Sequence, residues 1–260
     1  MRDSPYQLPE IYDIAFDFRD IPKAVDFLTS AAHRAGLTNI ASMVELGCGP
    51  GQYCREFARR KVTSYGVDFS TDMAAYASGL CRDEDLPCSI IEADMRDFRL
   101  PEPVDFACCM MATIHLLLTN EDLIASLRSV AANLTPGGLY LIEFSHPRDE
   151  YGDRSSTQNK WTMTRDYVTV ETDWGSDAVI DPVTEVNKGT ITYRVKTPTT
   201  TETHSFTERW RHIPAGLVKA LVELSGCFEI VEWYGDLDLN RPFDNGDKAW
   251  RMVTVLRKGN

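Results

Sequence analysis

The sequence predicts an α/β protein with a doubly wound, mostly parallel sheet that has helices on both faces. Strand-like and helix-like segments alternate over about the first half of the chain, which is typical of this class. The fourth strand-like segment, 104–111, is apolar throughout, as a central parallel strand usually is. From about residue 160 the pattern changes to period-two alternation rich in Thr, Val, Tyr and Trp, which predicts antiparallel strands. We therefore expect a core sheet with an antiparallel β insertion after the fifth strand.

The elements of the core follow from hydrophobic patterning and from helix-end signals. Strands are expected at 41–46, 62–69, 88–94, 104–111 and 139–144, and helices at 51–60, 70–81 and 120–134. The helix at 70–81 has N-cap chemistry at Ser70 or Thr71, and "TPGG" ends the helix at 120–134. A helix at 214–226 starts at proline and ends at glycine, and strands at 228–235 and 249–258 complete the core. The expected organisation is a helical cap at 1–40, a core at 41–147 and 213–260, and the insertion at 148–212.

Composition restricts the classes of function. The chain has 260 residues and a net charge of −12, which argues against a sequence-independent grip on nucleic acid, although a local basic patch would remain compatible. No apolar run approaches the ~20 residues that span a bilayer, and the first residues lack the apolar stretch of a secretory signal. Seven cysteines without a Cys-x-x-Cys pair predict reduced, mostly buried thiols in a cytoplasmic protein and no metal site.

A glycine-rich turn stands between the first strand and the first core helix, with Gly47, Gly49 and Gly51 at alternate positions. In open α/β sheets, ligands bind beyond the carboxyl ends of the strands, and glycine lets the backbone approach them closely. The third glycine comes one residue earlier than in the G-x-G-x-x-G pattern of dinucleotide-binding folds, and no Walker-type phosphate loop occurs. The turn therefore predicts a ligand other than a dinucleotide or a bare phosphate.

Three acids accompany the turn. Glu45 stands two residues before its first glycine, Asp68 ends the second strand and Asp94 ends the third. A carboxylate at the end of the second strand can accept both hydroxyls of a ribose. A carboxylate at the end of the third strand can accept from the amino group of adenine. Together these positions predict a ligand that contains adenosine.

At this point the sequence resembles the class I S-adenosylmethionine-dependent methyltransferases. The matching segments, in order and at the right separations, are "VELGCGPG" (44–51), "GVDFS" (66–70), "EADMRDF" (92–98), "VDFACCM" (104–110) and "LTPGGLYLIEF" (134–144). The resemblance covers roughly residues 40–145. It implies a Rossmann-like sheet of seven strands, in the order 3-2-1-4-5-7-6 with the seventh antiparallel, and S-adenosylmethionine as the cofactor.

The resemblance also implies roles for particular residues. Those on the methionine side of the cofactor would be Glu45, Gly47 and Gly49; those at the ribose and adenine would be Asp68, Phe69, Asp94 and Met95; those near the sulfonium would be Cys109 and Met110. A weaker likeness of "YDIAFDF" (12–18) and "ADMRDF" is to small-molecule members of the family, which include N-methyltransferases of amino sugars. It implies that Tyr12, or alternatively Tyr6, approaches the cofactor, and that the segment 148–212 covers the acceptor.

Two histidines are candidate bases. His115 follows the fourth strand and His146 follows the fifth, so both are expected at the edge of the sheet where acceptor and methyl group meet. A base matters only when the acceptor is protonated or is a weak nucleophile, and each histidine could equally cap a strand end. Five residues of the insertion are candidates either for an acceptor pocket or for its core: Trp161, Trp174, Tyr193, Trp210 and Arg211.

The sequence thus favours a methyltransferase that moves a methyl group from S-adenosylmethionine to an amine or hydroxyl of a small molecule by in-line displacement. Positioning is then the main catalytic contribution of the protein. Two alternatives stay open, a catalytically silent module that binds S-adenosylmethionine and a nicotinamide-dependent oxidoreductase, and a peptide or protein acceptor is also compatible. We expect a monomer or homodimer that has a small-molecule acceptor as its partner and binds neither nucleic acid nor membranes.

Overall fold

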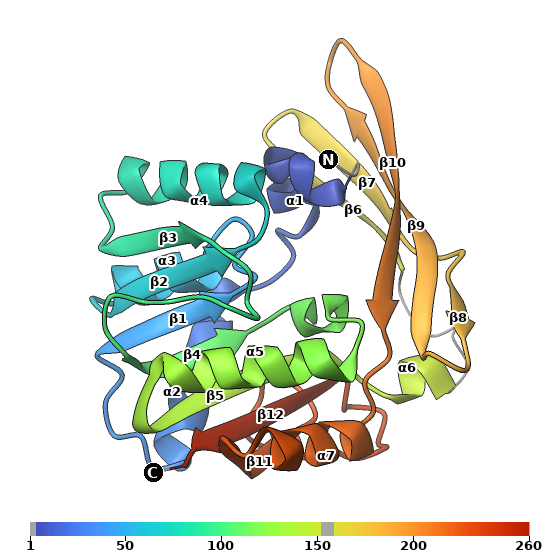
Figure 1. Cartoon of the computed structure of the whole chain (residues 1–260). Coiled ribbons are helices and arrows are strands. Elements are labelled where there is room, and N and C mark those ends of the chain that lie inside the picture. The colour runs from blue at the N-terminus through green and yellow to red at the C-terminus, as the bar shows by residue number, and fades with distance from the viewer. Residues whose placement is uncertain (1–3, 152–158, 260) are drawn as a thin grey trace.

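The computed structural model describes residues 4–151 and 159–259, and its centre is a seven-stranded sheet (Figure 1). The strands run across this sheet in the order β11-β12-β5-β4-β1-β2-β3. Their bounds are β1 Ser42–Leu46, β2 Thr63–Asp68, β3 Cys88–Glu92, β4 Val104–Cys109, β5 Leu134–Ser145, β11 Phe228–Tyr234 and β12 Arg251–Lys258. The pairs β1/β2, β2/β3, β1/β4 and β4/β5 are parallel, whereas β12 is antiparallel to both β5 and β11. The expected order 3-2-1-4-5-7-6, with the last strand of the chain antiparallel, is confirmed.

Helices cover both faces of this sheet, as predicted. The helices of the core are α2 Ile21–Arg34, α3 Gln52–Arg59, α4 Thr71–Asp83, α5 Asn120–Ala132 and α7 Ala215–Ser225. One buried cluster joins α5 and α7 to the sheet, and a second joins α2 and α3 to the opposite face. The hydroxyl of Ser70 accepts a hydrogen bond from the Met73 amide and so caps α4, while Gly226 ends α7 in the left-handed conformation. The expected helix ends at Ser70 and Gly226 are thus confirmed.

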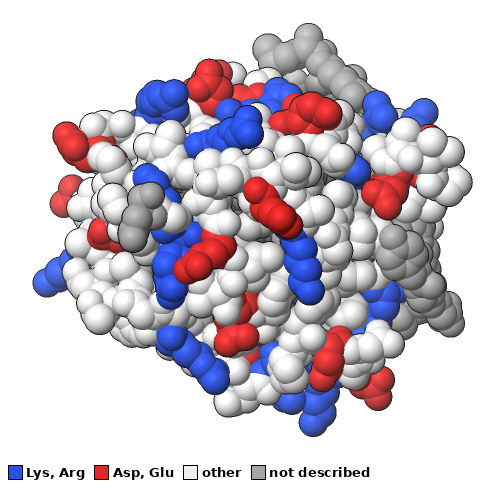
Figure 2. Space-filling view, turned by 60° about the horizontal axis from the view of Figure 1, so that its bottom comes forward, with Lys and Arg blue, Asp and Glu red and all other residues white. Residues whose placement is uncertain are grey.

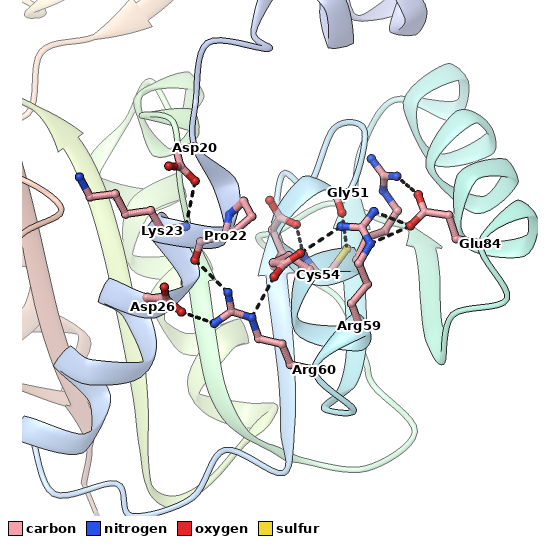
Figure 3. A network of polar contacts seen from close by, with 12 residues as sticks. Asp20, Pro22, Lys23, Asp26, Gly51, Cys54, Arg59, Arg60 and Glu84 are labelled. Carbon is pink, nitrogen blue, oxygen red and sulfur yellow. Dashed lines mark hydrogen bonds and ion pairs between the residues drawn. The ribbon is translucent and has the colours of Figure 1, made fainter.

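Ion pairs at the end of α3 connect it to its two neighbouring helices (Figure 3). Arg60 pairs with Asp26 of α2 at 2.6 Å and with Glu56 at 2.9 Å, and Arg59 pairs with Glu84 just after α4. Exposed pairs of this kind contribute little individually, about 0–1 kcal/mol each. They help to fix the position of α3, and the glycine turn lies at the other end of this helix.

The second sheet is antiparallel throughout, which confirms the expectation of antiparallel strands in this part of the chain. Its strands are β6 Lys160–Arg165, β7 Val168–Trp174, β8 Val179–Asp181, β9 Val186–Lys196 and β10 Thr201–Arg211. They run in the order β10-β9-β7-β6, with β8 paired to β9. A short helix, α6 Arg148–Tyr151, follows β5 and was not predicted.

The N-terminal elements lie between the two sheets. They are the short 3-10 helix η1 Pro5–Gln7 and the helix α1 Pro9–Ala15, whereas α2, which follows them, packs on the core sheet. In Figure 1, α1 lies beside α4 of the core and against β6 and β7 of the second sheet, and all three contacts are present. Ile14, Ala15 and Phe16 are buried in one cluster with Val170 and Ile191. The cap therefore joins the insertion to the core.

The sequence-based bounds are wrong at the end of β4 and at the start of β5. β4 ends at Cys109, because Met111 and Ala112 adopt left-handed conformations with φ of 57° and 59°; the 3-10 helix η2 Thr113–Leu116 follows. The "TPGG" segment does not lie outside the strand but forms its start, where the register shifts between Val104 and Phe106 of β4. The core sheet is otherwise close to its predicted extent.

All seven cysteines are free thiols, and five of them are buried, as expected. None of the helices within residues 4–151 and 159–259 is long and apolar enough to cross a membrane. On the face of the molecule in Figure 2, basic and acidic side chains of the described residues are interspersed and form no continuous basic stripe.

A buried carboxylate ties the cap to the carboxyl edge of the sheet. Glu143 of β5 is 1% exposed; it pairs with Arg19 and Arg251 at 2.8 Å each and accepts from the Met111 amide at 2.9 Å. Burial by itself would raise the pKa of Glu143, but the two arginines lower it below its ordinary value. Arg19 lies between α1 and α2, so this cluster holds the cap where the chain turns back over the sheet.

We expect Glu143→Gln to lower the free energy of unfolding by about 3 kcal/mol, because it leaves a buried arginine without a counter-charge. Glu229→Gln, which removes an exposed partner of Arg257, is the matched control and should cost less than about 1 kcal/mol. Urea unfolding of both variants at pH 7 measures the difference. Equal losses would show that the Glu143 cluster contributes no more than a surface pair.

Candidate active site

The glycine turn connects β1 to α3 at the carboxyl edge of the sheet. Gly47, Gly49 and Gly51 have positive φ of 58°, 50° and 72°, which side chains rarely adopt. A β-carbon added at Gly47 would collide with the methyl group of Thr113, and one at Gly49 would lie 3.8 Å from the Tyr12 ring. The turn therefore lies directly beneath η2 and the cap, and only glycine fits at position 47.

Asp68 lies beside this turn at the end of β2. One of its oxygens accepts from the Gly49 amide at 2.7 Å and the other from the Ser70 amide at 2.8 Å. Burial raises the pKa of Asp68, and these backbone N–H groups offset part of that effect. A carboxylate has about four acceptor positions, and the backbone donors do not use all of them. This arrangement fits the pair of hydroxyls on a ribose.

Glu45 lies beneath the turn and is 4% exposed. Its Oε2 accepts from the Cys54 amide at 2.8 Å, in the first turn of α3, and burial raises its pKa to about 8. The sequence places this acid on the methionine side of a cofactor. In the structure, the hydrogen bond to the Glu45 carboxyl group holds the start of α3 against the end of β1.

Three further predicted cofactor residues lie at the ends of β2 and β3. Phe69 follows β2 and is 77% exposed, so one face of its ring is available to a flat ligand. Asp94 binds Arg96, which also pairs with Asp122 at 2.5 Å, and the hydrogen bonds from Arg96 lower the pKa of Asp94. The Met95 methyl group lies 3.4 Å from the position of an added Gly47 β-carbon. The edge thus offers an aromatic face, an ionised acceptor and an apolar side chain, which fits adenine.

Cys109 and Met110 are buried in the core at 0% and 2% exposure, and they are not among the described residues that line the cavity beside the glycine turn. Met111, Ala112 and Thr113, which follow them, line the cavity beside the glycine turn. The place of Cys109 and Met110 near a sulfonium stays a prediction; the strand ends at Cys109 and not at 111, because the left-handed residues at 111 and 112 turn the chain. The sequence carries no signal for this turn, since neither Met nor Ala favours it.

A cavity of about 220 Å³ opens next to the glycine turn, where the cap, η2 and the second sheet meet. Six aromatic side chains line it: Tyr6, Tyr12, Phe16, Trp161, Trp174 and Trp210. Tyr12 and Thr113 line this cavity and are also the side chains nearest to β-carbons added at Gly49 and Gly47. The turn and the cavity therefore share a wall.

The aromatic wall is held together by ring contacts and by one hydrogen bond. Phe16 lies 4.4 Å from Tyr12, 5.4 Å from Trp161 and 5.2 Å from Trp174, measured between ring centroids. The Trp161 indole donates to the Ala15 carbonyl at 2.6 Å. Such edge and offset contacts fix the rings and leave their other faces to a ligand.

Two of the five candidate acceptor residues do not line this cavity. Tyr193 is buried in the cluster behind it, and Arg211 binds Asn120 at 2.7 Å and Glu185 at 3.4 Å. Sequence reasoning missed two carboxylates that do line it, Asp149 of α6 and Glu208 of β10. Isolated acids in a polar segment carry no signal of their own, because their position depends on how the insertion folds back.

His115 and His146 have both ring nitrogens occupied. Nδ1 of His115 lies 2.5 Å from the Arg211 carbonyl and Nε2 accepts from the Ser145 amide at 3.1 Å, which places the proton on Nδ1. Nε2 of His146 lies 2.9 Å from the Asp244 carbonyl, and Nδ1 accepts from the Arg148 amide at 3.2 Å. The His115 ring borders the cavity, whereas His146 is not among the residues that line it.

The cap is fixed over the turn by Asp13, a buried acid of α1. Its carboxylate accepts from Gln52 of α3 at 3.0 Å, from Tyr76 of α4 at 3.3 Å and from Arg165 of β6 at 2.7 Å. These donors come from the core and from the insertion. The three parts of the chain that surround the cavity therefore meet at one carboxylate.

A family model described as "Methyltransferase domain" matches residues 43–138. Two curated relatives come from Streptomyces. The dTDP-3-amino-3,4,6-trideoxy-alpha-D-glucopyranose N,N-dimethyltransferase of Streptomyces venezuelae is 27% identical over 139 residues, 52% of this chain and 55% of the relative. The dTDP-3-amino-3,6-dideoxy-alpha-D-glucopyranose N,N-dimethyltransferase of Streptomyces fradiae is 30% identical over 142 residues, 53% of this chain and 52% of the relative. The chain spans about half the length of these relatives.

Solved structures share the fold over nearly the whole chain. A S-adenosylmethionine-dependent methyltransferase from Clostridium acetobutylicum superposes with a TM-score of 0.79 at 15% identity, covering 98% of both chains. The CcbJ methyltransferase from Streptomyces caelestis gives 0.76 at 18% identity, covering 99% of both. The family match, the strand order and the glycine turn agree: residues 43–138 match a methyltransferase domain, and the chain has the fold of these solved methyltransferases.

Proposed function

We propose that this protein transfers a methyl group from S-adenosylmethionine to an amine of a small molecule. One observation supports this most directly: Tyr12 and Thr113 line the aromatic cavity and are also the side chains nearest to β-carbons added at Gly49 and Gly47 of the turn. Methyl transfer requires donor and acceptor to meet in line, with water excluded. A cofactor site and a cavity lined with aromatic rings that share a wall fit this requirement.

The residues present fit the cofactor. Asp68 would hold the ribose hydroxyls, Asp94 and Met95 the adenine, and the turn at Gly47 and Gly49 the amino-acid part. When bound, S-adenosylmethionine supplies a methyl carbon activated by a positively charged sulfur. The protein then needs no electrophile of its own, and its contribution is to orient the acceptor and keep water out.

An amine acceptor is supported by the chemistry of the cavity and by the relatives, three of which are named as N,N-dimethyltransferases of amino sugars. An amine reacts through its lone pair, so a protonated acceptor must first lose its proton. The carboxylate of Asp149 lines the cavity, and burial raises its pKa. A carboxylate with a raised pKa is a better base near neutral pH, so we assign the proton to Asp149.

His115 takes a positioning role in this proposal. Both of its ring nitrogens are engaged, and burial lowers its pKa to about 4. A proton on Nε2 would displace the Ser145 amide from the nitrogen that accepts it. His115 instead fixes the end of β5 to the last residue of β10, and so connects the core to the insertion beside the cavity.

Asp68→Ala should weaken binding of S-adenosylhomocysteine by about 1.5–3 kcal/mol, roughly 10- to 150-fold, because hydrogen bonds to a charged group are lost. Asp83→Ala, on the exposed end of α4, is the control and should keep the wild-type affinity. Titration calorimetry measures both. An unchanged dissociation constant in Asp68→Ala would defeat the ribose assignment.

Turnover tests the function itself. The full chain with S-adenosylmethionine and a pool of small amines should release S-adenosylhomocysteine, and none should appear without the pool. Binding without release from any pool would favour a silent binding module. Quenching of NADH fluorescence in place of S-adenosylmethionine binding would favour an oxidoreductase.

His115 also makes stability depend on pH. Its pKa is about 4 when folded and near 6.5 when unfolded, so between these values only the unfolded chain takes up the proton. The free energy of unfolding should therefore fall as the pH drops from 6.5 towards 4, by about 3 kcal/mol from this group.

Comparison of variants isolates that contribution. His115→Gln, which does not titrate, should lose less stability than the wild type over this range in urea unfolding. His33→Gln, on the exposed end of α2, should follow the wild-type curve. Parallel curves for His115→Gln and the wild type would contradict the assignment.

A further inference from the structure

A single arginine joins two carboxylates just after the end of β3. Arg96 donates to Asp94 through three nitrogens: its Nε lies 3.0 Å from both carboxylate oxygens, its Nη2 lies 2.5 Å from Oδ2, and its backbone amide lies 2.9 Å from Oδ1. The remaining nitrogen, Nη1, lies 2.5 Å from the carboxylate of Asp122 on α5. The guanidinium therefore connects the edge of the sheet to the start of a helix that covers it.

This arrangement differs from an isolated surface ion pair. Exposed pairs contribute little to stability, unless an arginine binds a carboxylate with two prongs or several charges form a network. Arg96 meets both conditions, because its side chain reaches both oxygens of Asp94 and also pairs with Asp122. A two-pronged contact fixes the plane of a carboxylate as well as its place.

The segment that carries this arginine is anchored to α5 at further points. The Asp97 amide donates to the Asp94 carbonyl at 2.9 Å, which closes a tight turn. The amide of the buried Phe98 donates to the Ser129 hydroxyl at 3.1 Å, and the Asn133 side chain donates to the Phe98 carbonyl at 3.0 Å. These bonds hold the turn against the helix, so Asp94 stands on a fixed backbone.

The Asp94 carboxylate keeps capacity for a further donor. A carboxylate has about four acceptor positions, and three N–H groups of Arg96 donate to this one. The Asp94 side chain is 27% exposed, so a ligand can reach it. The hydrogen bonds from Arg96 also lower the pKa of Asp94, which keeps the group ionised and therefore an acceptor only.

Resting on the proposed function, we propose that Arg96 is a positioning residue of the cofactor site, which holds the Asp94 carboxylate in the orientation that accepts from the amino group of adenine. Arg96 does not itself bind the cofactor, and Asp122 acts by holding the other end of Arg96. A fixed acceptor favours a purine that carries a donor at this position, whereas a carboxylate that is free to turn towards water loses part of this preference.

The test compares two ligands that differ only in this amino group, S-adenosylhomocysteine and its analogue in which hydrogen replaces the 6-amino group of the purine. Each is titrated calorimetrically into the full chain. We expect the wild type to bind S-adenosylhomocysteine about tenfold more tightly than the analogue, because the analogue cannot donate to a charged acceptor. Equal affinities would show that no acceptor meets the amino group and would overturn the proposal.

Variants of Arg96 separate positioning from a merely structural role. Arg96→Ala should weaken binding of S-adenosylhomocysteine about fivefold and leave the affinity for the analogue nearly constant, so that the preference falls to about twofold. Arg96→Lys keeps a positive charge without the two-pronged contact and should lose the preference to a similar degree. Equal weakening of both ligands in Arg96→Ala contradicts a positioning role, and a full preference in Arg96→Lys contradicts the role of the two-pronged contact.

Asp122→Asn tests the contact at the other end of Arg96. It should lower the preference in the same direction by about twofold, since Arg96 loses one of its two counter-charges. Arg99→Ala, at an exposed position of the same segment, is the matched control and should keep the wild-type preference; its side chain donates to the Phe98 carbonyl. An unchanged preference in Asp122→Asn removes Asp122 from the proposal, and a loss in Arg99→Ala equal to that in Arg96→Ala overturns the assignment to Arg96.

The two proposals fail in different ways. If neither ligand binds, the proposed function fails and the role of Arg96 fails with it. If both ligands bind and the Arg96 variants keep the wild-type preference, the function stands and Arg96 has no positioning role. The wild-type titrations and the conservative variants Arg96→Lys and Asp122→Asn keep the test valid even where Arg96→Ala does not fold.

Discussion

The site depends on one buried carboxylate, that of Asp13. Burying a carboxylate is unfavourable unless donors replace its water, and Asp13 receives them from Gln52, Tyr76 and Arg165. Because these donors belong to the core and to the insertion, the carboxylate is satisfied only when α1 lies between them. The same position places Tyr12 over the glycine turn and Phe16 against Trp161 and Trp174. The hydrogen bonds of the Asp13 carboxylate thus fix α1 in the position that forms one wall of the cavity.

This arrangement divides the work between two parts of the chain. The parallel sheet brings the ends of β1, β2 and β3 to one edge, and this alone fixes Asp68, Phe69 and the turn at Gly47. The cap and the insertion add the aromatic wall and the acids Asp149 and Glu208. Under the proposed function, a change in the insertion would alter the acceptor while the donor site keeps its geometry, which is how a fold supports several chemistries.

Much of the core could be predicted because its signals are local. Apolar runs predict β1 and β4, and the glycines predict the turn. The position of Asp68 at the edge of the sheet follows from the predicted end of β2. The cavity could not be predicted in the same way. Met111 and Ala112 adopt left-handed conformations that their side chains do not favour. The Met111 amide donates a hydrogen bond to the Glu143 carboxylate, which is distant in the sequence, and this bond stabilises the turn.

The histidines show how much of a residue's surroundings its type and position leave open. His115 lies at the edge of the sheet, as expected of a base, yet its partners are the Ser145 amide and the Arg211 carbonyl, 30 and 96 residues away. A sequence does not reveal bonds over such separations. Burial makes the charged imidazolium unfavourable, and the two backbone groups define a single tautomer. A ring fixed in this way is suited to hold two strands together. The proposed function therefore assigns proton transfer to Asp149, whose carboxylate borders the same cavity and accepts from no backbone group of the described residues.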